Sequence, residues 1–308
     1  MTYPIKEGKI PYDAKGAGKP CETYYKIVGD LKPGVTPVIA LHGGPGGGHE
    51  YLHPLTDLYT NFGLPVIFYD QIGCGASTHL REKMGDDSFW TIELFVAELE
   101  NLITYFKLHD TGFHLFGLSW GGMFCSLYAS RKPKGLGRLI MLSSPASIPL
   151  YHEGLQDILQ EMGPEAQEIV RRCDEQGTQD SEEYQGVCAK FGRMHTCRLD
   201  PPPEELKKAF ANLKDDGTSI LTMQGHSRFV FTGAAFKDYE GAKEWGHLIE
   251  VPTLVANGEY DHVKDKCFAP WFWHIPKVRW VSLKGASHVG QWEARERIMG
   301  LAGEFLTS

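Results

Sequence analysis

A serine set between glycines is the residue in this chain best suited to nucleophilic chemistry. The stretch Gly117-Leu118-Ser119-Trp120-Gly121 matches the pattern G-x-S-x-G and lies between an apolar, strand-like run and a helical pattern. Such a serine sits on a tight strand-to-helix turn that lifts its hydroxyl above the edge of a sheet, and larger neighbours would clash there. The context therefore predicts that Ser119 is the nucleophile of a hydrolase.

A serine hydroxyl needs a base, and the base needs a carboxylate that orients it. With a nucleophile of this kind the partners follow in the order acid, then histidine, each on a loop after a later strand. Asp261 and His288 each follow such a strand-like run. We therefore predict a triad of Ser119, Asp261 and His288, with Glu259 and Asp265 as alternative orienting carboxylates on the loop of Asp261.

A glycine-rich loop, residues 42–48, follows the first apolar run. Acyl transfer builds an oxyanion, and backbone N–H groups must face it closely. We expect these donors to be the N–H groups of Gly44 and of Trp120, and we expect Gly43 to line the substrate site. The loop fits neither G-x-G-x-x-G nor G-x-x-x-x-G-K-[ST], which argues against a phosphate-binding loop.

The stretch His49-Glu50-Tyr51-Leu52-His53 matches H-E-x-x-H, the motif of zinc proteases. A zinc protease needs both histidines on one helix face and a third ligand. Here a glycine loop precedes the motif and Pro54 follows it at once. We therefore interpret the match as a coincidence and predict no metal site.

The elements that must position these residues alternate between strand and helix. Continuous apolar runs separated by helices are typical of a parallel sheet covered on both faces. The expected strands are residues 38–41, 66–69, 113–116, 139–142, 253–256 and 278–283. The expected helices include one that Ser88 caps and that continues to about 106, and others at 120–130, 204–213 and 291–305.

A polar, helical segment interrupts this alternation. No run between about 152 and 213 resembles a buried strand. We therefore predict an α/β fold with a core formed by residues 1–144 and 247–308 and an inserted helical cap formed by residues 145–246.

The composition and net charge of the chain indicate which classes of binding partner are unfavourable. The 308 residues carry a net charge of -8, with 42% hydrophobic residues, so the chain can bury a core and its charge disfavours nucleic acid and anionic membranes. The seven cysteines have no C-x-x-C spacing and are interpreted as free thiols. The first twenty residues lack the apolar stretch of a secretory signal. We expect a cytoplasmic protein that binds neither nucleic acid nor membrane; its oligomeric state does not follow from the sequence.

Five segments together resemble the proline iminopeptidase family of α/β-hydrolases, which includes L-amino acid amidases. These segments are residues 42–46 (HGGPG), 70–77 (DQIGCGAS), 117–122 (GLSWGG), 197–200 (CRLD) and 258–261 (GEYD). The resemblance implies the α/β-hydrolase fold and a peptidase, amidase or esterase with a helical cap. It also implies no cofactor and a small-molecule or short-peptide substrate, and it agrees with the predicted triad.

Two positions depart from the family pattern. The aminopeptidases of the family hold the substrate's ammonium with one glutamate in a cap motif, Gly-Pro-Ser-Glu-Phe, and another directly after the triad aspartate. Here the corresponding residues are Arg228 and His262. We therefore predict that Arg228 and His262 contact the substrate and that the substrate is an ester, lactone or amide of a small molecule without a free α-ammonium.

Two alternatives are kept. In the first, Arg228 turns outward, other acidic residues bind the ammonium, and the protein is a true proline iminopeptidase or amino acid amidase. In the second, the protein keeps the fold but binds a ligand without catalysis. The complete triad and oxyanion loop argue against the second alternative, since binding alone needs neither.

Overall fold

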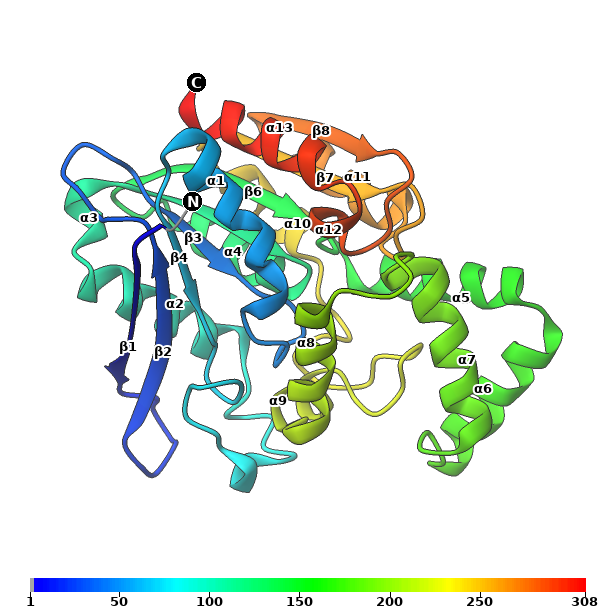
Figure 1. Ribbon diagram of the computed structural model, residues 1–308. Helices are drawn as coiled ribbons and strands as arrows, with labels where there is room; N and C mark the ends of the chain where they lie inside the picture. Colours follow the sequence, from blue (N-terminus) through cyan, green and yellow to red (C-terminus); the bar gives the residue numbers. More distant parts are fainter. Residues whose placement is uncertain (1–2) are drawn as a thin grey trace.

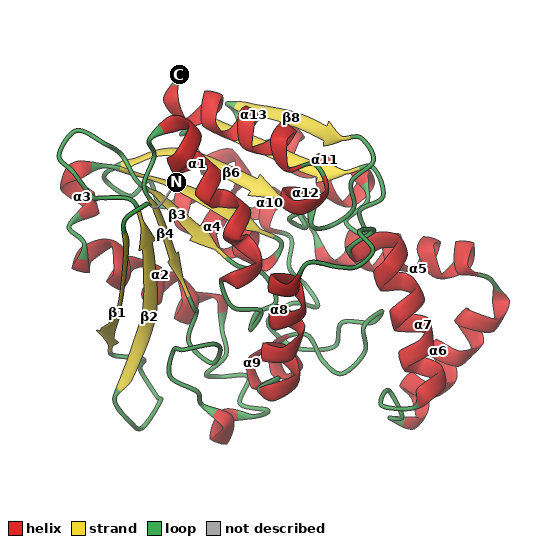
Figure 2. Cartoon of the chain, in the orientation of Figure 1, coloured by secondary structure: helices red, strands yellow, loops and turns green. Residues whose placement is uncertain are grey.

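The computed structural model describes residues 3–308, and a single eight-stranded sheet forms its centre (Figures 1 and 2). The strand order across the sheet is β1-β2-β4-β3-β5-β6-β7-β8. The strands are β1 (Ile5–Tyr12), β2 (Cys21–Val28), β3 (Val38–Leu41), β4 (Val66–Tyr69), β5 (Phe113–Leu118), β6 (Leu136–Leu142), β7 (Thr253–Gly258) and β8 (Val278–Leu283). The predicted α/β fold with a mostly parallel sheet is confirmed.

The sheet is parallel from β4 to β8, whereas β1 and β2 pair antiparallel with each other and β2 pairs antiparallel with β4. The sequence did not predict β1 and β2. Buried and exposed positions alternate along β2, and most of β1 is exposed, as suits strands near the edge of a sheet. Such strands lack the continuous apolar run that marks the central ones.

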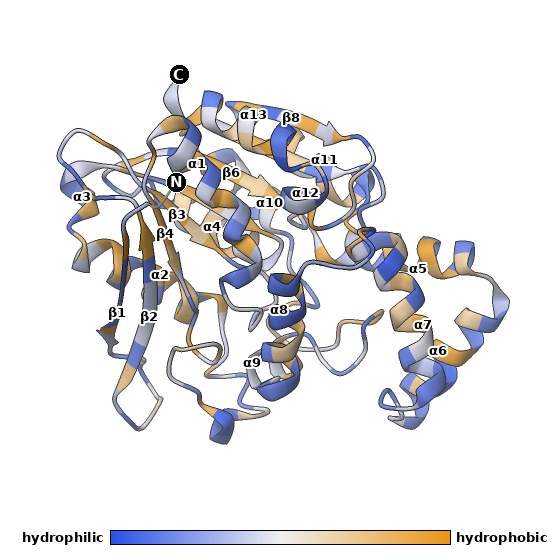
Figure 3. Ribbon diagram, in the orientation of Figure 1, coloured by the Kyte–Doolittle hydropathy of each residue, from blue (hydrophilic) through white to orange (hydrophobic). Residues whose placement is uncertain are grey.

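Helices cover both faces of the sheet, as predicted. Ile39 and Leu41 of β3 belong to one buried hydrophobic cluster, and Val38 and Ala40 belong to another. Successive residues of a strand point to opposite faces, so each face of the sheet has its own core. The central strands are mostly hydrophobic (Figure 3), because neither of their faces meets water.

The helices divide into those beside the sheet and those of an inserted helical region. The first group comprises α1 (Thr56–Phe62), α2 (Ile92–Tyr105), α3 (Leu108–Thr111), α4 (Trp120–Ser130), α10 (Gly241–Trp245), α11 (Asp265–His274), α12 (Gly290–Glu293) and α13 (Arg295–Thr307). The inserted helices are α5 (Ile148–Met162), α6 (Pro164–Gln176), α7 (Glu182–Phe191), α8 (Glu204–Asp215) and α9 (Thr218–Met223).

The inserted region follows β6, and its helices α6 and α7 project from one side of the molecule (Figure 1). Helices α5 to α9 fall within the predicted cap, 145–246, and α10, near the end of that range, contacts α4 and α11 of the core. The limits of the cap stay a prediction. None of the helices described over residues 3–308 combines the length and the apolar character that crossing a bilayer requires.

Two details of the predicted helices were wrong. Helix α2 begins after Thr91, whose side chain accepts a hydrogen bond from the N–H of Leu94, while the hydroxyl of Ser88 donates to Asp86 in the preceding turn. The predicted helix over 291–305 is two helices, separated at Ala294, whose backbone is not helical. Thr91 is therefore the N-cap in place of Ser88, and the non-helical backbone of Ala294 divides the C-terminal helix in two.

Candidate active site

Ser119 lies on the sharp turn between β5 and α4. Its backbone has a φ of 55°, which is uncommon for a residue with a side chain. The neighbouring glycines allow this turn. A Cβ on Gly117 would lie 2.6 Å from the carbonyl oxygen of Gly121, and a Cβ on Gly121 would overlap the carbonyl of Leu41. The pattern of small residues around Ser119 therefore follows from the close packing of α4 against the sheet.

The predicted base and acid meet at the ends of two adjacent strands. Asp261 follows β7 and His288 follows β8, and Nδ1 of His288 lies 2.8 Å from Oδ1 of Asp261. Both side chains are buried. Because a carboxylate only accepts hydrogen bonds, Nδ1 carries the proton, and Nε2 is left as an acceptor. His288 lines the same cavity as Ser119.

The two alternative carboxylates have other partners. Glu259 accepts a hydrogen bond from the backbone N–H of Gly285, and Asp265 accepts one from the side-chain amide of Asn257. The geometry therefore favours Asp261 as the carboxylate that orients His288.

The two residues predicted to supply the oxyanion donors, Gly44 and Trp120, line the cavity beside Ser119. Gly44 has a φ of 118°, which favours glycine. Trp120 is the first residue of α4, and the first N–H groups of a helix have no acceptor within it. The N–H of Gly43, in contrast, donates to the hydroxyl of Tyr51 at 2.6 Å. Gly43 therefore supplies no free donor. Its lack of a side chain instead lets the glycine loop lie close to the nucleophile, since a Cβ at Gly43 would lie 3.1 Å from Cβ of Ser119.

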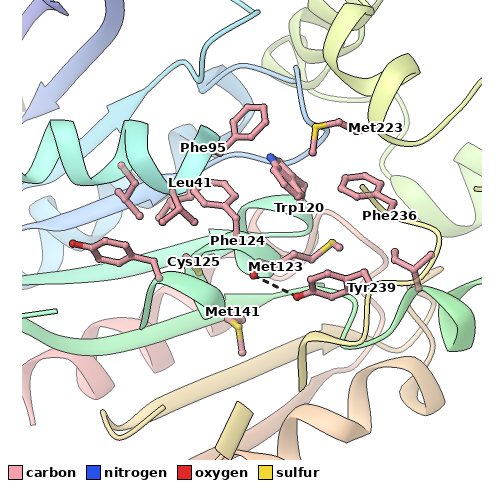
Figure 4. Close-up of a cluster of buried hydrophobic side chains, with 14 of the residues drawn as sticks. Leu41, Phe95, Trp120, Met123, Phe124, Cys125, Met141, Met223, Phe236 and Tyr239 are labelled. Carbon is pink, nitrogen blue, oxygen red and sulfur yellow. Dashed lines mark hydrogen bonds between the residues drawn. The ribbon is translucent and has the colours of Figure 1, made fainter. Parts of the chain in front are cut away.

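The side chain of Trp120 is anchored in the core, so that its backbone stays fixed. Figure 4 shows the indole between Phe95 and Phe236, and the ring centroids lie 5.2 and 5.1 Å away. Its Nε1–H donates to Oε1 of Gln71 at 2.9 Å. Rigid backing of this kind keeps backbone donors in place.

Gln71, which the sequence did not single out as a site residue, joins Trp120 to the glycine loop. Its side-chain amide donates to the carbonyl of His42 at 2.9 Å, and its N–H donates to Nε2 of His42 at 3.0 Å. Nδ1 of that ring therefore carries the proton and donates to the carbonyl of Gly43 at 2.9 Å. Burial lowers the pKa of His42 to about 4, so the ring stays neutral. The only signal for Gln71 was its place in the segment DQIGCGAS.

A cavity of about 800 Å³ opens over Ser119 between the core and the inserted helices. This volume suits a small molecule. Most of its lining is apolar. Apart from histidines, the charged residues that line it, among those described, are Arg193, Arg198, Arg228 and Asp200.

The two residues that depart from the family pattern, Arg228 and His262, both line this cavity and touch each other. Nη2 of Arg228 lies 3.4 Å from Nε2 of His262, and the hydroxyl of Tyr151 lies 2.8 Å from Nδ1 of the same ring. The ring of His262 stacks on that of His288, with centroids 3.9 Å apart. Burial, and then the neighbouring His288 and Arg228, hold the pKa of His262 well below its usual range, so this ring is neutral.

Comparisons with known proteins agree with this geometry. The family model described as alpha/beta hydrolase fold matches residues 36–295. A proline iminopeptidase of Saccharolobus solfataricus is 32% identical over 92% of this chain and 88% of its own length.

The chain belongs to the proline iminopeptidase family of α/β-hydrolases.

Two solved structures are similar over nearly the whole chain. The crystal structure of VinJ superposes with a TM-score of 0.91 at 35% identity, and covers 98% of both chains. The proline iminopeptidase of Mycobacterium smegmatis superposes with a TM-score of 0.84 at 32% identity, and covers 97% of this chain and 98% of its own. Membership of the proline iminopeptidase family makes this protein a serine hydrolase.

In this member of the proline iminopeptidase family the H-E-x-x-H stretch is not an α-helix. Residues 50–55 form a 3-10 helix, in which residues four apart do not share a face. His49 contacts Asp70 at 2.7 Å, and the half-exposed His53 contacts the hydroxyl of Tyr3. The two histidines therefore have separate structural partners.

Proposed function

We propose that this protein cleaves an ester, lactone or amide bond in a small molecule whose acyl portion lacks a free α-ammonium. The observation that carries the proposal is the contact between Arg228 and His262 inside the cavity of Ser119. A guanidinium and a neutral imidazole supply no negative charge. An ammonium that leaves water needs such a charge to offset its desolvation.

The proposed reaction is acyl transfer in two steps. Ser119 attacks the carbonyl carbon while His288 takes the hydroxyl proton through Nε2, and Asp261 holds the imidazole. The N–H groups of Gly44 and Trp120 stabilise the oxyanion. His288 then gives its proton to the leaving group, and water, activated by the same histidine, cleaves the acyl-enzyme.

The rest of the cavity supports the same substrate class. Its one carboxylate among the described lining residues, Asp200, is exposed to solvent, which screens its charge. Three arginines line the cavity with it. The described lining residues therefore contain no pair of acidic side chains that could bind a substrate ammonium.

The second candidate is a true proline iminopeptidase or amino acid amidase. The names of the curated relatives favour it, since several are proline iminopeptidases at about 30% identity. At this identity a family keeps its fold and its reaction type more readily than its substrate.

The deciding experiment compares prolyl-4-nitroanilide with N-acetylprolyl-4-nitroanilide and with a neutral ester, 4-nitrophenyl butyrate, at one enzyme concentration. We expect the neutral substrates to have the higher kcat/KM. A tenfold or greater preference for the free amine would instead establish the second candidate.

A further inference from the structure

The contacts around His262 leave the hydroxyl hydrogen of Tyr151 without an acceptor in the described part of the chain. A guanidinium only donates, so Nε2 of His262 accepts from Arg228 and Nδ1 carries the proton of the neutral ring. Nδ1 therefore donates to the hydroxyl oxygen of Tyr151. The hydroxyl hydrogen of Tyr151 then points elsewhere, and among residues 3–308 this hydroxyl makes no hydrogen bond besides the one with His262. Tyr151 lines the cavity.

Arg228 is a half-buried cation without a counter-ion. Within the described part of the chain its guanidinium forms no ion pair with a carboxylate, and it lies over the ring of Phe191, 5.1 Å from the centroid. Other arginines of the inserted region do have such partners; Arg171, for example, pairs with Glu168 and Glu175. An unpaired guanidinium in an apolar cavity attracts an anion strongly, because little water screens it.

Two further arginines give the cavity a positive field. Arg193 and Arg198 are exposed members of its lining, opposed there by one carboxylate, Asp200. Exposed charges act mainly by steering a ligand of opposite sign. They favour the entry of an anion, whereas the half-buried Arg228 favours its binding.

We propose that Arg228 and the hydroxyl of Tyr151 together bind a carboxylate of the substrate, so that the substrate class is half-esters and half-amides of dicarboxylic acids or similar carboxylate-bearing esters and amides. The planar fork of a guanidinium matches the two oxygens of a carboxylate. The stack of His262 on His288 places this pair beside the base. This inference rests on the proposed function in taking Ser119 as the reacting residue.

The test measures binding and turnover separately. Isothermal titration calorimetry measures the affinity of the Ser119→Ala variant for three acids that differ only at the far end: glutarate, butyrate and 4-aminobutyrate. Phenol and 4-hydroxybenzoate probe the leaving-group side in the same way. Wild-type protein is assayed on 4-nitrophenyl butyrate, which reports the hydrolase reaction without the carboxylate.

We expect glutarate or 4-hydroxybenzoate to bind at least tenfold more tightly than the counterpart that lacks the added carboxylate, butyrate or phenol. Which of the two does so shows the side of the substrate that carries the carboxylate. Arg228→Gln and Tyr151→Phe, each in the Ser119→Ala background, should each remove most of this preference, since a hydrogen bond to a charged group contributes roughly tenfold or more in affinity. Arg279→Gln, at an exposed arginine on β8, is the matched control and should keep it.

The outcomes separate the two proposals. Turnover of 4-nitrophenyl butyrate without any preference for a carboxylate overturns the carboxylate site and leaves the proposed hydrolase intact. A carboxylate preference without turnover of any ester or amide overturns the proposed hydrolase and leaves the binding site intact. A preference for 4-aminobutyrate over butyrate, or a preference for glutarate that survives Arg228→Gln, also overturns the carboxylate site.

Discussion

The imidazole ring of His262 lies against the ring of His288, with centroids 3.9 Å apart and planes 27° apart. His288 gains a positive charge when it takes a proton from Ser119. A second charged ring at this distance would oppose that step. The pKa of His262 lies well below its usual range, chiefly because the ring is buried, so His262 stays neutral and gives the base a flat, uncharged surface to pack on.

The first prediction concerns the nucleophile. Ser119→Ala should remove nearly all turnover, because no other group attacks the carbonyl, and it should leave the melting temperature close to that of the wild type. A fluorophosphonate probe should label wild-type protein at Ser119. Ser88→Ala, at an exposed serine, is the control and should keep both activity and labelling. A protein that is never labelled and hydrolyses none of a panel of 4-nitrophenyl esters would support the non-catalytic alternative.

The second prediction concerns the sign of the charge in the cavity. Arg228→Glu should raise kcat/KM for prolyl-4-nitroanilide, because a carboxylate beside His262 can pair with an ammonium. The double variant Arg228→Glu/His262→Glu, which restores both acidic residues of the family pattern, should raise it further. The same variants should lose activity on N-acetylprolyl-4-nitroanilide or leave it unchanged. No gain on the free amine in either variant would mean that Arg228 does not face the acyl portion of the substrate.

The third prediction concerns Gln71 as a positioning residue. Gln71→Leu removes the hydrogen bonds that its side chain makes to Trp120 and to the carbonyl of His42. Loss of a direct oxyanion donor costs a factor of roughly 10² to 10³ in kcat, so we expect a smaller loss here, about tenfold, with little change in KM. Steady-state kinetics check this split. A change in KM alone would show that Gln71 shapes substrate binding rather than the oxyanion donors.

The fourth prediction concerns a buried carboxyl beneath the loop of Gln71. Glu98 is fully buried and accepts hydrogen bonds from Thr23 and from the N–H of Ile72. Burial, and then the nearby Asp70, raise the pKa of Glu98 to about 8, from 4.5 for an unperturbed glutamate. Between these values the folded state holds a proton that the unfolded state has lost. The stability that protonated Glu98 contributes to the folded state is therefore complete below pH 4.5 and is lost as the pH rises through 8.

Glu98→Gln tests this linkage, because glutamine keeps the shape of the protonated acid and does not titrate. Relative to the wild type, the variant should gain stability between pH 5 and pH 8, on the order of a few kcal/mol. Urea unfolding at several pH values gives the free energy of unfolding of both proteins. In the difference between them the effects of other titrating groups cancel, such as those of the buried His42 and His114. A difference that does not change with pH would show that Glu98 is ionised throughout.

The fifth prediction compares two glycines in helices. Gly121→Ala should cost about 3 kcal/mol or more, since the new Cβ would overlap the backbone carbonyl of Leu41. Gly186, an exposed residue of α7, has nothing within 4 Å of the position of a Cβ. Gly186→Ala should therefore stabilise the protein by about 0.5 to 1 kcal/mol through its higher helix propensity. Thermal unfolding measures both; equal effects would contradict the packing argument.

The sequence by itself determined the central strands and the places where the predicted site residues follow them. The central strands could be predicted because both of their faces are buried, which requires continuous apolar runs. Ser119, Asp261 and His288 could be predicted because each follows such a strand, and parallel strands bring their carboxyl ends to one edge of the sheet. The two departures from the family pattern were also visible in the sequence alone.

Only the tertiary structure decided how those residues meet. Asp261, rather than Glu259 or Asp265, contacts His288, and this depends on the path of a loop whose side chains differ little in type. Arg228 comes from a segment after α9 and His262 from one after β7, so nothing local predicts their contact. Local patterns specify strands and helices, but the partner of a polar side chain is fixed by packing between segments far apart in the chain.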